Sequence, residues 1–230
     1  MDPALTASEP TAAGGLAEAG RLHWREDASE RTLRRDGRRW TAWTTWIVAV
    51  FALPGVLLIA IEPLTFPVAA ICFAHAWAIP WIQARRGARQ VVPIGSERSA
   101  AHRADADRGA EGLALGLLGD LVGHAERDLL RETGLALQRG ALGAWLVGEQ
   151  GALLVRSHGR RVDCWCVRVA ESAELPAGDR VAHLLLALRE DELGFAKVAN
   201  LGFSGASRRV RRHLEGPARP ALDAARAAVR

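Results

Sequence analysis

The sequence predicts an α+β protein in which a transmembrane helical hairpin of two spans is followed by a small cytoplasmic α+β domain. Three observations predict it. Residues 40–84 carry one charge, Glu62. After residue 110, leucines recur at helical spacing, and then come short valine-rich segments separated by turn residues. The domain should therefore contain a three-stranded antiparallel meander and three or more helices.

We expect four parts along the chain. Residues 1–39 form a disordered to charged N-terminal segment, and residues 40–84 form the two-helix transmembrane hairpin. Residues 85–109 form a polar linker. Residues 110–230 form the cytoplasmic domain, which is long enough to build its own core.

Composition excludes two protein classes and leaves several open. With 230 residues, 49% of them hydrophobic, and a net charge of +4, the chain is neither a disordered polypeptide nor a small disulfide scaffold. Its basic residues are arginines except for Lys197, a bias typical of a GC-rich genome. A pI near 9.7 therefore permits attraction to anionic lipid or nucleic acid without favouring either.

Two uncharged runs are long enough to cross a bilayer. Residues 40–61 number 22, which as a helix span about 33 Å, enough for a hydrocarbon core of about 30 Å. Residues 63–84 form an equal run, and Glu62 and Pro63 allow only a tight turn between them. A buried hairpin of a soluble core and a cleaved signal peptide are the alternatives. The run is too long and starts too late in the chain for the signal peptide.

Flanking residues predict the orientation. Arginines precede the first span and follow the second, while the turn between the spans has no basic residue. Because arginines near membrane ends resist translocation, we expect a multi-pass protein of the bacterial inner (plasma) membrane with both termini in the cytoplasm. The predicted interface residues are Trp40, Trp43, Trp77, Trp81, Arg38, Arg39, Arg85 and Arg86.

His75 is an ionisable residue inside the second span, which makes it a candidate for proton transfer or metal binding. A neutral imidazole that bonds to the facing helix, or lies near the headgroups, is the favoured alternative because neither span contains an acidic partner. Cys72, one turn earlier, is interpreted as a small buried hydrophobic residue. Two helices enclose no pore, so transport would require a homo-oligomer.

Within the domain, residues 110–133 have the spacing of one helix that ends at Gly134. Segments 144–147, 152–156 and 162–169 predict the meander strands. Asp179 is expected to cap a helix. Residues 195–203 are expected to form a short strand or a loop. We expect Ser204 to cap a basic helix that ends near His213, and residues 221–229 to form a last helix.

The domain offers two candidate binding patterns and no cofactor site. In a strand, Cys164 and Cys166 share a face and, with His158 or His183, could bind a soft metal; core cysteines are the favoured interpretation because a second ligand pair is missing. The basic helix is expected to contact lipid phosphates or to be solvated, and lacks the interleaved aromatics of nucleic-acid sites. Its exposed arginines are Arg208, Arg209, Arg211 and Arg212.

Catalytic motifs are not apparent. Ser157 and His158 lie in a turn, and the segment around Ser204 lacks the spacing of a nucleophile elbow. The order of helix and strands from Gly109 is similar to the opening of the nuclease-related domain family, which has a restriction-endonuclease-like fold. That resemblance covers about 60 residues. It implies a strand aspartate and a Glu-x-Lys, where this chain has Ala144-Trp145 and Val155-Arg156-Ser157, and so an inactive relative.

The sequence therefore favours a binding or scaffolding module, for a protein partner or for the inner-leaflet surface. The alternative is a membrane-tethered hydrolase, with a degenerate nuclease-like domain as one form. The two differ in whether polar residues converge in one cleft, as a hydrolase requires. The polar residues whose convergence would favour a hydrolase are Glu111, Glu149, Asp163 and Lys197.

Overall fold

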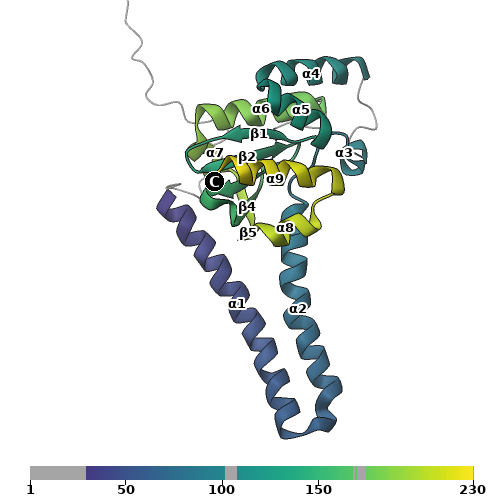
Figure 1. Cartoon of the computed structure of the whole chain (residues 1–230), viewed down its shortest axis with the longest axis vertical. Helices are drawn as coiled ribbons and strands as arrows, with labels where there is room; N and C mark the ends of the chain where they lie inside the picture. The colour runs from purple at the N-terminus through teal and green to yellow at the C-terminus, as the bar shows by residue number, and fades with distance from the viewer. Residues whose placement is uncertain (1–29, 102–107, 168, 170–174, 230) are drawn as a thin grey trace, which may run out of the picture.

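A computed structural model describes residues 30–101, 108–167, 169 and 175–229. Two long apolar helices extend from one side of an α+β domain, and the domain contains a five-stranded antiparallel sheet with helices on both faces (Figure 1). The α+β class is confirmed. The expected three-stranded meander is wrong in strand number, because two further strands flank it.

The hairpin consists of α1 (Glu30–Ile61) and α2 (Phe66–Ala88), joined by a 3-10 turn over Pro63–Thr65. Both helices are long and apolar enough to cross a membrane. Only 6% and 17% of their most apolar windows are buried, whereas a core helix of a soluble protein is mostly buried. This exposure fits an association with the membrane better than a soluble core.

The sheet is a simple meander in the order β1-β2-β3-β4-β5, with every neighbouring pair antiparallel. Its three central strands match the prediction and are linked by the expected turns. Of the edge strands, β1 was not expected and is only four residues long, whereas β5, which contains two glycines, was expected only as a short strand or loop over residues 195–203. The strands are β1 (Ala136–Arg139), β2 (Gly143–Gly148), β3 (Gly151–Arg156), β4 (Arg161–Cys166) and β5 (Asn200–Ala206).

Helices bury both faces of the sheet. On one face α6 (Ala177–Glu190) and α7 (Glu192–Val198) cover Trp145 and Trp165, and α4 (Arg108–Leu121) lies against α6. Since strand side chains alternate, Leu146 and Cys164 point to the other face. The helices on that face are α9 (Arg219–Ala228), α8 (Ser207–His213) and the last turns of α2.

Two predicted helices differ in detail. The helix expected over residues 110–133 is interrupted, so that α4 ends at Leu121 and α5 (His124–Thr133) starts after Gly123. Gly134 ends α5 with a φ of 68°, which confirms the predicted stop. Ser204 does not cap a helix: it lies within β5, and α8 starts at Ser207. The remaining helix, α3, spans Glu97–Ala101.

The edge strand β5 joins the hairpin to the domain. It contacts both α1 and α2, which separate towards the domain in Figure 1. Phe203 of this strand is 2% exposed, and its ring lies 6.1 Å from that of Trp40. A Cβ atom on Gly87 would lie 2.4 Å from Phe203 Cβ. Helix α2 therefore reaches the strand closely only because residue 87 is glycine.

Candidate functional site

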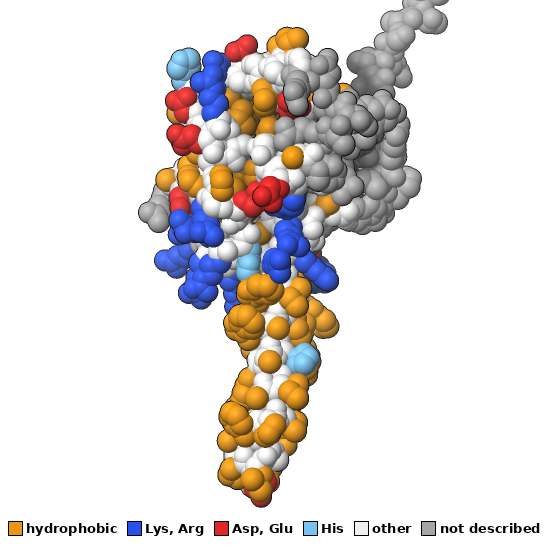
Figure 2. Space-filling view, turned by 90° about the vertical axis from the view of Figure 1, so that its right-hand side faces the viewer, with side chains coloured by type: hydrophobic (Ala, Val, Ile, Leu, Met, Phe, Trp, Pro, Cys, Tyr) orange, Lys and Arg blue, Asp and Glu red, His pale blue; other side chains and the backbone are white. Residues whose placement is uncertain are grey.

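The most distinctive surface lies where the hairpin meets the domain. Exposed arginines of α1, α2, the turn before β4, and α8 gather there, and Figure 2 shows basic side chains concentrated at this level above the apolar hairpin. Among the described residues none of them forms an ion pair. This arginine belt consists of Arg38, Arg39, Arg85, Arg86, Arg89, Arg160, Arg208, Arg209 and Arg212.

Arg211, also predicted as a basic surface residue, is neutralised within the domain. Its guanidinium donates to Asp223, with nitrogen–oxygen distances from 2.7 to 3.1 Å. This hydrogen bond lowers the pKa of the Asp223 carboxyl. Arg211 therefore adds less to the positive potential of the surface than its neighbours on α8.

Aromatic contacts fix α2 against α8. The Trp81 ring stacks near Trp77 at 5.9 Å, receives Arg85 over its face at 5.2 Å, and meets His213 edge-on at 5.1 Å. Burial, followed by the charges of Arg85 and Arg212, lowers the pKa of His213. The imidazole is therefore neutral at neutral pH. Trp43, on α1, is 58% exposed and has its surface available to the surroundings of the hairpin.

A polar cluster fixes α1 against β4 and β5. Asp163 is fully buried, receives a short hydrogen bond from Ser204 Oγ, and forms a close ion pair with Arg156. Arg161 Nε donates to Ser204 at 3.0 Å, and its Nη2 donates to the Gly37 carbonyl and, at 2.7 Å, to Thr41 Oγ1. One buried carboxylate thus orders two arginines that reach the first helix.

Beside this cluster lies a junction pocket of about 450 Å³. Its basic side chains are Arg160, Arg161 and Arg209, from the turn before β4, from β4 and from α8. The facing wall is one side of α1, with three threonines followed by Val48. Among the described residues that line it, none is acidic. The pocket is therefore suited to an anion.

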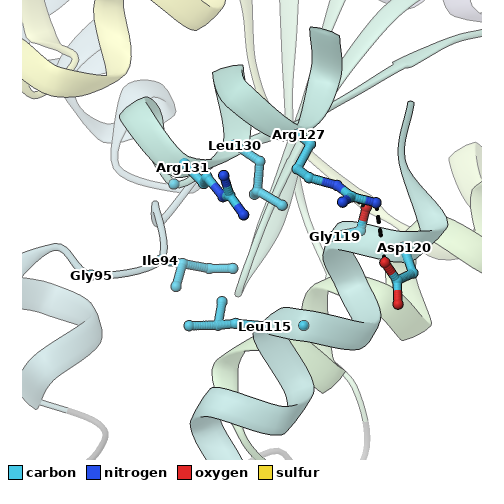
Figure 3. A pocket seen from close by; sticks show the side chains of 10 residues that line it. Ile94, Gly95, Leu115, Gly119, Asp120, Arg127, Leu130 and Arg131 are labelled. Atoms are coloured by element: carbon cyan, nitrogen blue, oxygen red, sulfur yellow. Dashed lines mark hydrogen bonds and ion pairs between the residues drawn. The ribbon is translucent and has the colours of Figure 1, made fainter. Parts of the chain in front are cut away.

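A larger cavity of about 570 Å³ (Figure 3) is lined by residues of α4 and α5, which lie at the end of the domain away from the hairpin in Figure 1. Its wall is formed by Leu115, Ile94 and Leu130 together with several glycines, and Arg131 points towards it. Arg127, on its rim, donates to the Gly119 carbonyl and pairs with Asp120 at 3.1 Å. Neighbouring leucines of α4 are exposed, Leu113 by 70%. The cavity has an apolar floor and no nucleophile among its described lining residues.

The residues that would separate a hydrolase from a binding module have distinct partners. Glu149 is buried, receives a short hydrogen bond from Ser99 and pairs with Arg180 at 2.6 Å. Glu111 accepts from the Ala177 amide at 2.9 Å and so supports the start of α6. Asp163 belongs to the junction cluster, and Lys197 is half-buried on α7. Glu111 and Glu149 both contact the first turn of α6, whereas Asp163 and Lys197 lie in other parts of the described domain.

The proposed metal candidates are also separated. Cys164 is buried in the core, where burial and the charge of Asp163 raise the pKa of its thiol, so it stays protonated. Cys166 is half-buried and His158 is exposed in a turn, at a φ of 70°. Within the described part of the chain no three His, Cys, Asp or Glu side chains form a metal-binding group.

His75 contacts its own helix and the facing one. Its Nδ1 lies 2.8 Å from the Ile71 carbonyl, and its ring stacks on Phe51 of α1 at 5.3 Å. These contacts use the imidazole as a packing group between the two helices. Cys72 lies near Gly55 of the facing helix, where it also has a packing position.

Comparisons with known proteins find no match: no protein family, no curated protein and no solved structure is similar to this chain. The resemblance to the nuclease-related domain family is therefore not supported by a family match. Sequence reasoning found the basic helix but missed the junction pocket. Arg161 and Thr41 lie 120 positions apart, and no local pattern connects them.

Proposed function

We propose that this chain is a two-span inner-membrane protein whose domain is a non-catalytic binding module held against the cytoplasmic leaflet. The observation that carries the proposal is the arginine belt. It lies at the level where the apolar hairpin ends, and its members have no ion-pair partner among the described residues. Clusters of arginine next to a membrane span are attracted to anionic headgroups by about 1 kcal/mol per residue.

The polar interior of the domain supports binding rather than catalysis. Asp163 and Glu149, the two fully buried acids of the candidate set, each pair with an arginine and accept a hydrogen bond from a serine. Carboxylates paired in this way stabilise the fold and are not in position to activate a nucleophile. A protein partner and a homo-oligomer stay predictions, and the lipid surface is the partner that the geometry supports best.

The proposal can be tested by thermal unfolding of the full chain in nanodiscs. We expect the melting temperature to be about 3 °C or more higher in phosphatidylglycerol nanodiscs than in phosphatidylcholine nanodiscs, and molar salt to remove the difference. The variant R86Q/R89Q should lose part of this difference in melting temperature. The control R131Q/R139Q removes the same charge from the domain away from the hairpin and should keep the full difference. Equal melting in the two lipids would contradict the proposal.

The orientation of the hairpin in the membrane is tested separately, by cysteine labelling. In a chain whose native cysteines are replaced by alanine, a membrane-impermeant maleimide should label Leu64→Cys, at the hairpin tip, from the periplasmic side. Leu64 is 87% exposed, so its substitution changes no packing. Labelling of this position only after the membrane is opened would place the tip in the cytoplasm and reject the predicted topology.

A further inference from the structure

We propose that the junction pocket binds the phosphodiester of an anionic phospholipid from the cytoplasmic leaflet. The inference deepens the proposed function and rests on it, because it requires the hairpin to lie in the bilayer. It goes further by assigning a specific site in place of general attraction to a charged surface. The site lies between α1, the β4–β5 edge and α8.

The chemistry of the lining fits a phosphate group. Arg160, Arg161 and Arg209 surround the pocket from three elements, and no described lining residue is acidic. Arg160 and Arg209 form no ion pair with a described carboxylate. Guanidinium groups match the geometry of phosphate oxygens and bind them through charge-assisted hydrogen bonds. A single phosphate would give Arg160 and Arg209 a counter-ion, and it would add to the charge of Asp163 near Arg161.

Arg161 is held in place before any ligand arrives. Its Nε and Nη2 are bound to Ser204, Gly37 and Thr41, which fix the plane of the guanidinium. Burial lowers its pKa, while Asp163 opposes that effect. A partly desolvated, oriented cation loses little side-chain entropy when it binds an anion, and this makes the pocket more selective than an exposed arginine.

Hydroxyl groups on α1 complete the polar side. Thr44 Oγ1 donates to the Trp40 carbonyl at 2.8 Å, and Thr41 Oγ1 donates to the Gly37 carbonyl at 3.1 Å. Thr45, which is exposed on the same helix, also lines the pocket. Thr41, Thr44 and Ser204 already donate their hydroxyl hydrogens within the protein, so their oxygens can accept from the hydroxyls of a glycerol headgroup, whereas Thr45 can donate to a phosphate oxygen.

The apolar part of the pocket selects a lipid over a soluble phosphate. Val48 lies on α1 beyond the threonines, on the side of the hairpin tip, and Phe203 forms part of the opposite wall. Further towards the tip, on other sides of α1, Val50 and Leu53 are exposed apolar side chains, so the hairpin is apolar beyond the pocket. An acyl chain that leaves a phosphate in this pocket would therefore meet an apolar environment. Free phosphate would gain nothing from it.

The test compares two arginine pairs of equal charge in the full chain in a nonionic detergent. Bound phosphatidylglycerol is counted by native mass spectrometry during a lipid titration, with phosphatidylcholine as the zwitterionic reference. The pocket variant is R160Q/R209Q. The matched control is R208Q/R212Q, because both residues are exposed on α8 and neither lines the pocket. Inorganic phosphate and glycerol 3-phosphate, at millimolar concentration, are added as competitors.

We expect the pocket variant to bind phosphatidylglycerol about tenfold more weakly, since two charge-assisted hydrogen bonds are lost. The control removes two belt arginines outside the pocket and should lose clearly less affinity, because it removes only longer-range attraction. The competitors should displace nothing. An equal loss in both variants would overturn the pocket while the arginine belt, and with it the proposed function, would stand. Unchanged binding in the pocket variant, or displacement by either soluble phosphate, would also overturn it. Failure of the proposed function is seen separately, in the nanodisc and labelling experiments.

Discussion

Single residues connect parts of this chain that are far apart in sequence. Asp163 is the clearest case, because one fully buried carboxylate binds Arg156 and Ser204, and Arg156 in turn donates to the Leu33 carbonyl of α1 at 3.1 Å. A buried charge without its partner costs several kcal/mol, so each member of the cluster depends on the others. The cluster determines where the first helix can leave the domain.

We expect Asp163→Asn to lower the free energy of unfolding by about 3 kcal/mol, because it leaves the Arg156 guanidinium without its counter-charge in a mostly buried site. Chemical unfolding of the full chain in detergent, followed by tryptophan fluorescence, measures the change. The control is Asp223→Asn, which breaks the Arg211 pair at a side chain that is 43% exposed and should cost about 1 kcal/mol or less. Equal losses of unfolding free energy in the two variants would show that the buried Asp163–Arg156 pair contributes no more stability than the exposed Asp223–Arg211 pair.

At the scale of elements, the important contact is that of β5 with the hairpin. An edge strand exposes unpaired backbone groups unless something covers it. Here α1 and α2 lie beside the strand, and Phe203 fills the space between Trp40 and Gly87. The hairpin therefore protects the sheet edge as well as extending from it.

Gly87→Ala tests this contact. The added Cβ would lie 2.4 Å from Phe203 Cβ, so strand and helix must separate, and we expect a loss of about 1–3 kcal/mol. Gly116→Ala is the matched control, since a Cβ there meets nothing within 4 Å and alanine should stabilise α4 by about 0.5–1 kcal/mol. Thermal unfolding of both variants measures the difference. Similar melting of the two would mean that α2 does not approach the strand closely.

Elements that depend on local sequence could be predicted, whereas elements that depend on tertiary contacts could not. The hairpin followed from an uninterrupted apolar run, and β2, β3 and β4 followed from turn residues between short apolar segments. Strand β5 was predicted only as a strand or loop that ends at residue 203, because Gly202, Ser204 and Gly205 have low strand propensity. Its structure depends on pairing with β4 and on contact with the hairpin. The prediction that Ser204 caps a helix was wrong because the local sequence does not reveal its actual hydrogen-bond partner. That partner is Asp163, 41 positions away.

The candidate site divides in the same way. The basic helix is a local pattern, and the structure has a helix there, α8. The interfacial position of the tryptophans stays a prediction. The junction pocket requires Thr44 of α1, Arg161 of β4 and Arg209 of α8 to meet, and only the tertiary structure brings them together. The sequence marks Asp163 as a candidate acid of a nuclease-like site, whereas in the structure it is neutralised by Arg156.

At the scale of the whole molecule, the hairpin is a part of the fold and more than an attachment to it. Leu33 of α1 and Ala84 and Ala88 of α2 are buried in the two core clusters of the domain, together with Val91 just after the helix. Apolar burial is the main favourable term in folding. Removal of the hairpin therefore removes core side chains and uncovers the sheet edge at once.

We expect a fragment of residues 90–230 to aggregate or to lack a cooperative thermal transition, because it exposes Phe203 and loses the core residues of both helices. A chain that starts at residue 30 keeps every described contact and should unfold cooperatively in detergent. Solubility, circular dichroism and differential scanning fluorimetry on both proteins measure this. A soluble fragment 90–230 with a sharp transition would show that the domain folds without the hairpin.

The position of β5 between the two helices also determines the order in which the parts of the chain can fold during synthesis. A ribosome delivers α1 and α2 first and β5 only after the other four strands. On the proposed topology, the hairpin enters the lipid before Phe203 exists, and the domain stays open until that strand arrives. If synthesis stopped before β5, a membrane-inserted protein would remain with its sheet edge bare, and quality-control proteases at the membrane would have access to it.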